Sequence, residues 1–162
     1  MDKHTNRFSK PKSDLKDKVL DIRRVARVVA GGKRLRFRTT IVVGDERGRV
    51  GVGIGKGADV AQSVAKAKTD AQKNLITVPL RGATIPHEVE AKFSAAQVRI
   101  KPAVKGHGLK AGGAVRAVLA LSGVKDASAK CLGRTPNKLT NALAAIEALK
   151  KLKTTPRPSW QQ

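Results

Sequence analysis

Every second residue of one short segment is a glycine. Three glycines alternate there with three β-branched residues, in the order Val50-Gly51-Val52-Gly53-Ile54-Gly55. Because the side chains of a strand point alternately to its two faces, this pattern predicts a strand at 49–54 with the β-branched residues directed inward and the opposite face bare. Another backbone can approach a bare face closely, and this requirement constrains the fold around the strand.

The segments around this strand predict a first unit of three antiparallel strands and one helix. A strand at 19–30 ends at a glycine pair, and a second alternating run occupies 35–43. After the third strand, Asp59 is placed to cap a helix that runs to about Leu75. The apolar residues of this helix recur at helical spacing: Val60, Val64, Ala67, Ala71 and Leu75.

A second unit follows a linker that contains Pro79 and Gly82. Its predicted elements are strands near 86–93, 96–101 and 129–132, a glycine-rich loop at 102–113, and helices at 114–121 and from Pro136 onward. The fold class is therefore α+β with two small domains, which we expect to pack on each other because each has a size at which folding is marginal. The predicted divisions are a disordered basic arm (1–14), a first domain (15–78), a linker (79–83), a second domain (84–154) and a tail (155–162).

The chain is basic along its whole length. It has 34 Lys and Arg against 12 Asp and Glu, a formal charge of +22. Residues 1–78 carry 19 basic and 8 acidic residues and residues 79–162 carry 15 and 4, so each half has a net charge of +11. Like charges repel within a folded protein, so this charge indicates a polyanionic partner, with nucleic acid first. Aromatic residues make up 2% of the chain, which favours recognition of RNA shape and backbone over base stacking.

The segment 23–38 has seven basic residues and no acidic one. Alternation along 35–43 places the apolar residues on one face and Arg34, Arg36 and Arg38 on the other. One interpretation is a solvated strand face, but such faces usually mix both signs of charge, so we predict that this hairpin binds phosphates. The predicted RNA-binding residues are Arg23, Arg24, Arg27, Gly31, Gly32, Lys33, Arg34, Arg36, Arg38 and Lys56.

Two glycine motifs are similar to nucleotide-binding loops. The first, at 51–57, lacks the P-loop spacing, because Val50 stands where a glycine is required and Gly57 where a Ser or Thr is required. The second, at 106–111, matches the dinucleotide pattern Gly-x-Gly-x-x-Ala, but no further βαβ units complete such a site. We interpret the first motif as close packing of a strand, and the second as a flexible loop beside a helix N-terminus, where anions are attracted.

No set of residues indicates catalysis, a metal or a cofactor. The three histidines lack cysteine or carboxylate neighbours at ligand spacing, and the single Cys131 is expected to pack as a small apolar residue in its strand. The N-terminus lacks an apolar signal core, and the apolar runs are too short to cross a bilayer. We therefore predict a cytoplasmic protein that is not an enzyme and has no cofactor, small-molecule substrate or membrane partner.

Taken together, four stretches closely resemble the bacterial small-subunit ribosomal protein S-five family. The first-domain stretch is RRVARVVAGGKRLRFRTTIVVGDERGRVGVGIGKG, and the second-domain stretches are ATIPHEVEAKF, RIKPAVKGHGLKAGGAVRAVL and SGVKDASAKCLG. They occur in the family's order, and the resemblance covers about residues 15–152.

The resemblance implies a first domain like the double-stranded-RNA-binding fold without its leading helix, and a second α/β two-layer sandwich with a left-handed βαβ crossover. It implies a structural protein of the small ribosomal subunit, bound to ribosomal RNA (rRNA) near the neck and decoding region. Such a protein contributes to subunit assembly and translational accuracy, with ribosomal proteins S-four and S-eight as neighbours and the path by which mRNA enters close by.

For individual residues, the resemblance implies that the hairpin tip around Gly31, Gly32, Lys33 and Arg34 approaches rRNA. The loop region at 106–116 would lie toward S-four, where substitutions in the family alter decoding accuracy. The residues expected at this protein interface are Gly106, Gly108, Lys110 and Arg116.

Two other classes of function remain open from the residues alone. A free regulator that binds double-stranded RNA would explain the charge, but not the equally basic second unit. An enzyme with a nucleotide-binding relative of the second fold would need ATP contacts, and no motif supports them.

Overall fold

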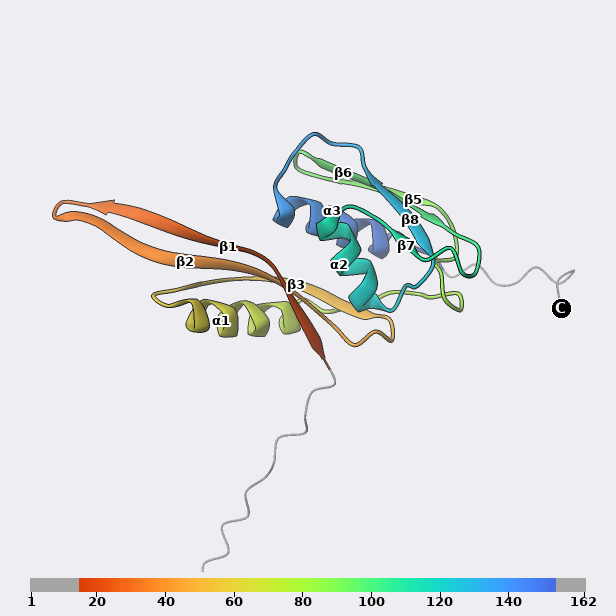
Figure 1. Ribbon diagram of the computed structural model, residues 1–162, viewed down its shortest axis with the longest axis horizontal. Helices are drawn as coiled ribbons and strands as arrows, with labels where there is room; N and C mark the ends of the chain where they lie inside the picture. Colours follow the sequence, from red (N-terminus) through yellow and green to blue (C-terminus); the bar gives the residue numbers. More distant parts are fainter. Residues whose placement is uncertain (1–14, 154–162) are drawn as a thin grey trace, which may run out of the picture.

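The computed structural model describes residues 15–153. The predicted arm at 1–14 and tail at 155–162 lie outside this range. Figure 1 shows two sheets and a long hairpin that projects from the first sheet. One helix belongs to the first sheet and two helices belong to the second. The two-domain α+β class is as predicted.

The first sheet has four antiparallel strands in the order β1-β2-β3-β4. Its elements are β1 (Lys16–Val29), β2 (Gly32–Gly44), β3 (Arg49–Gly57), α1 (Val60–Lys73) and β4 (Ile76–Thr77). The two-residue strand β4 pairs with the start of β3. No strand was predicted at β4 from the sequence. A strand this short has no alternation of its own and is defined by its partner.

Helix α1 packs on the glycine face of β3. A Cβ at Gly53 would lie 2.2 Å from the Ala71 nitrogen, and a Cβ at Gly55 would lie 2.2 Å from the Ser63 carbonyl oxygen. No side chain fits there, so the predicted close approach of another backbone is confirmed and its occupant is α1. Asp59 stands at the helix N-cap as expected, but its side chain makes no capping hydrogen bond.

The other face of the first sheet packs against the second domain. Val42, Val50 and Val52 belong to the same buried cluster as Leu119 and Ile146 of the second domain's helices. The two domains therefore share one core, as their small size led us to expect. The prediction that Ile54 points inward was wrong: it is 38% exposed, because this part of β3 extends beyond the cluster that buries Val50 and Val52.

The second sheet has the order β5-β6-β8-β7. Its elements are β5 (Val89–Phe93), β6 (Ala96–Pro102), β7 (Leu109–Lys110), α2 (Gly113–Ser122), β8 (Ala127–Cys131) and α3 (Lys138–Lys150). Strands β7 and β8 are parallel and α2 connects them, which gives the βαβ unit implied by the resemblance. Both helices contact the first sheet as well as the second domain's own strands, so they form the layer between the two sheets.

Two details of the second domain differ from the sequence prediction. The loop at 102–113 contains β7, which again is two residues long and is defined by pairing. Helix α3 begins at Lys138 and not at Pro136, because Asn137 takes the N-cap position and its side chain accepts a hydrogen bond from the Leu139 nitrogen at 3.2 Å.

Candidate nucleic-acid interface

The hairpin of β1 and β2 continues well beyond the rest of the first sheet (Figure 1). Strand β3 ends at Gly57, opposite Phe37, so the part between Arg24 and Phe37 is a two-stranded ribbon. Its turn is Ala30–Gly31, and Gly32 follows with a φ of 127°, a conformation that favours glycine. The ribbon is therefore open to ligands on both faces.

The strand register brings six basic side chains onto one face of this hairpin. Arg38 lies between Arg23 of β1 and Lys56 of β3, and Arg27 lies opposite Arg34. Arg36 faces the same way, opposite Val25. We call this surface the basic face, and its residues are Arg23, Arg27, Arg34, Arg36, Arg38 and Lys56.

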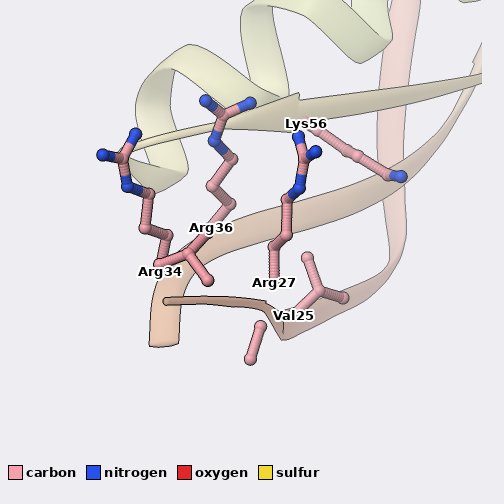
Figure 2. A pocket seen from close by; sticks show the side chains of 7 residues that line it. Val25, Arg27, Arg34, Arg36 and Lys56 are labelled. Atoms are coloured by element: carbon pink, nitrogen blue, oxygen red, sulfur yellow. The ribbon is translucent and has the colours of Figure 1, made fainter. Parts of the chain in front are cut away.

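A groove of about 570 Å³ runs along the basic face. Figure 2 shows the guanidinium groups of Arg27, Arg34 and Arg36 pointing the same way above Val25, with the Lys56 side chain nearby. Val25 and Val29, which also line the groove, are half-buried. The groove thus has an apolar floor covered by aliphatic stems, with the charged ends of the side chains presented outward.

Little negative charge balances the basic face. Among residues 15–153, Arg23 is its one member with a carboxylate partner, Asp21. Like charges directly opposite each other destabilise a sheet, and the register contains three such pairs: Arg23 with Arg38, Arg38 with Lys56, and Arg27 with Arg34. A polyanion on this face would convert that repulsion into attraction and release counterions.

The structure separates two predicted RNA-binding residues from this group. Arg24 lies opposite Phe37 and Lys33 lies opposite Val28, so both belong to the other face of the ribbon. Gly31 and Gly32 form the tip, where an added Cβ would meet no atom within 4 Å. Sequence alternation was clear in β2, but β1 has apolar residues on both faces and did not reveal this division.

The second predicted interface is the loop between β6 and β7. Gly106 and Gly108 have φ values of 86° and 75°, which favour glycine, and open space surrounds both. The Gly108 nitrogen donates a hydrogen bond to Asp126 Oδ1 at 2.8 Å, and Asp126 is 6% exposed. This buried carboxylate fastens the loop to the start of β8, a role that the sequence prediction missed because nothing near Asp126 in sequence indicates it.

The two cations predicted at this interface are both exposed. Lys110 is in β7, and Arg116 is in the first turns of α2, where its backbone nitrogen donates to the Gly112 carbonyl at 2.7 Å. Cys131 lies nearby, with its sulfur 3.3 Å from where a Cβ at Gly112 would be. Burial raises the pKa of the Cys131 thiol, so the thiol stays protonated at neutral pH, consistent with a packing role.

Two further observations concern the described part of the chain. Within it, no helix is both long and apolar enough to cross a membrane. Residues 15–153 also contain no cluster of three or more His, Cys, Asp or Glu side chains that could hold a metal ion.

Comparison with known proteins gives matches to both halves of the chain. The family described as Ribosomal protein S5, N-terminal domain, matches residues 15–79, and Ribosomal protein S5, C-terminal domain, matches residues 91–161. The Small ribosomal subunit protein uS5c of Guillardia theta is 48% identical over 153 residues, which span 94% of this chain and 90% of that relative.

These matches decide among the classes of function left open by the residues. A member of this family is a structural, non-enzymatic constituent of the small ribosomal subunit, with rRNA and other ribosomal proteins as partners and the ribosome as its location. The interpretations as a free RNA-binding regulator and as an enzyme are therefore set aside. The chain belongs to the ribosomal protein S5 family.

Proposed function

We propose that the basic face of the hairpin is the principal rRNA contact of this protein, and that it binds the phosphate backbone. The observation that carries this proposal is the row of five cations without a carboxylate partner among residues 15–153: Arg27, Arg34, Arg36, Arg38 and Lys56. Phosphates fit this surface because guanidinium groups pair with them in a bidentate geometry. The scarcity of aromatic side chains agrees with backbone recognition.

In the assembled subunit, this contact would lie near the neck and decoding region, beside the path of incoming mRNA. The loop at 106–116 would contact S-four, and S-eight would be a second protein neighbour. The support for the S-four assignment is the exposed Gly106 in the loop and the exposed cations Lys110 and Arg116. Through these contacts the protein would contribute to subunit assembly and accuracy.

Charge reversal at the hairpin tests the rRNA contact. In Arg34→Glu/Arg36→Glu, two phosphate ligands become repulsive, so incorporation into small subunits should fall at least tenfold in cells that also supply the unaltered protein. Incorporation is measured by sedimentation of tagged protein through a sucrose gradient after a high-salt wash.

A matched variant separates this site from a general effect of charge. Lys66→Glu/Lys73→Glu changes the net charge equally, at two exposed positions of α1, and should incorporate normally. Normal incorporation of the hairpin variant, or equal loss in both variants, would contradict the proposal.

A further inference from the structure

The face of the ribbon opposite the basic face is apolar and uncovered. Its residues, fixed by the strand register, are Ile22, Arg24, Ala26, Val28, Lys33, Leu35 and Phe37. We call it the apolar face. Val28 is 74% exposed, and Ile22 and Leu35 are each 45% exposed. Contiguous exposed apolar surface of this kind marks an interaction site.

Helix α1 covers only the base of this surface. There Thr39 Oγ1, on the residue opposite Ile22, lies 2.7 Å from the buried Ser63 Oγ of α1. Toward the tip, β3 ends opposite Phe37, and among residues 15–153 no other element lies beside the projecting end of the hairpin in Figure 1. The two faces therefore differ in how far their apolar side chains are covered. Val28 and Leu35 of the apolar face are exposed, whereas Val25 and Val29 of the basic face are half-buried.

The charges on the apolar face indicate the chemistry of its partner. Arg24 and Lys33 flank the apolar side chains toward the two ends of the face, and neither pairs with a carboxylate in the described part of the chain. None of its seven residues is acidic. A surface with a basic margin and an apolar centre fits nucleic acid, because it can contact phosphates together with riboses and base edges.

We propose that the hairpin is held between two segments of rRNA. The basic face binds the phosphates of one segment, while Val28, Leu35 and their neighbours on the apolar face contact ribose and base surfaces of a second segment. Arg24 and Lys33 hold the phosphates of that second segment. This inference rests on the proposed function, because it requires the basic face to lie on rRNA.

The ribbon's thinness makes this arrangement possible. It is one strand layer thick, so the partners of its two faces are separated by little more than the backbone and two sets of side chains. A two-stranded ribbon is marginally stable by itself. RNA on both faces would fix its position, and apolar contact on one face would contribute affinity that salt does not weaken.

Site-specific crosslinking distinguishes the two faces. The photoreactive amino acid p-benzoylphenylalanine is placed at Leu35 in one full-length variant and at neighbouring Arg36, on the opposite face, in another. Assembled small subunits are irradiated and the crosslinked nucleotides are mapped. We expect both positions to crosslink to rRNA, but to different segments.

The other outcomes each have a definite meaning. Crosslinking of position 35 to a protein, to the same RNA segment as position 36, or to nothing would overturn the two-segment inference alone. Failure of position 36 to reach rRNA would instead overturn the proposed function on which the inference rests.

A binding measurement covers the case in which a crosslinking variant does not assemble. Val28→Ala/Leu35→Ala should weaken binding of the full chain to small-subunit rRNA on the order of tenfold, because apolar contact is lost. The salt dependence of binding should stay unchanged, since no charge is removed. Unchanged affinity would overturn the inference.

Discussion

Both halves of β2 pair with β1, but one half is buried and the other is exposed. From Thr39 to Gly44, every residue is buried, whereas from Gly32 to Arg36 every residue is exposed. The inner half is covered by α1 on one face and by the second domain on the other. Within residues 15–153, the outer half has only β1 beside it. The inner half of β2 therefore forms part of the core, and its outer half is available to bind rRNA. The two halves meet where β3 ends, opposite Phe37.

This difference shows how the protein can carry concentrated positive charge and still fold. The inner half supplies apolar burial in two clusters. The like-charged pairs lie in the outer half (Arg27 with Arg34) or at its boundary (Arg38 with Arg23 and Lys56), where water and salt weaken the repulsion. The predictions below test this division in order of decreasing effect.

The largest effect should come from filling the bare face of the inner half. In Gly53→Ala, the new Cβ would lie 2.2 Å from the Ala71 nitrogen and 2.3 Å from the Ala67 carbonyl oxygen, so α1 must move off the sheet. We expect the free energy of unfolding to fall by about 3 kcal/mol. Urea denaturation of the free protein measures this change.

A glycine of the turn at the hairpin tip provides the control. At Gly31 an added Cβ meets no atom within 4 Å. Gly31→Ala should therefore change the free energy of unfolding by less than about 0.5 kcal/mol. Equal destabilisation by both substitutions would mean that the tip is as tightly packed as the base.

Much of this fold could be predicted from the alternation of residues in β2 and β3. Glycine at every second position required a close backbone, and the arginines of β2 had to share a face. The elements that cover Val50 and Val52 could not be predicted. Alternation along a strand indicates which face is buried but not which part of the chain packs on it. They pack on the second domain instead of within the first.

The composition of the site was harder to predict than its location. Val25, Ala26, Val28 and Val29 place apolar residues on both faces of β1, so no period of two separates Arg24 from its neighbours. A register irregularity between Val19 and Asp21 further obscures the alternation. Only the pairing with β2 assigns Arg24 to the apolar face.

A substitution in the turn between β2 and β3 should have an intermediate effect on stability, and this effect should depend on pH. Burial by itself would raise the pKa of Asp45, but hydrogen bonds from Arg49 and Arg47 bring this pKa below its ordinary value of 3.8. Asp45 accepts from both backbone nitrogens, at 2.9 and 2.8 Å, and from Arg49 Nε at 2.6 Å. The ionised carboxylate therefore stabilises the folded state.

Asp45→Asn should cost about 1–2 kcal/mol at pH 7. Because the pKa is lowered on folding, the stabilisation is present above the ordinary value and is lost as pH falls through the lowered one. The difference between the two proteins in urea denaturation should accordingly shrink below about pH 4. A difference that stays constant down to pH 2 would show that the charge of Asp45 contributes nothing.

The smallest effect should have the opposite sign. Arg27→Gln removes the like charge opposite Arg34, so the free protein should gain a few tenths of a kcal/mol at low salt, and this gain should disappear at high salt. Urea denaturation at two ionic strengths measures it. Destabilisation would mean that the basic face is held together by contacts other than those described.

The salt dependence of rRNA binding shows whether the basic face binds phosphates. The dissociation constant of the full chain for small-subunit rRNA is measured over a range of salt for the unaltered protein, for Arg34→Gln/Arg36→Gln and for the control Lys66→Gln/Lys73→Gln. If the basic face binds phosphates, the slope of log K against log salt becomes shallower by about 2 in the hairpin variant alone. An unchanged slope in that variant, or the same change in the control, would contradict the account.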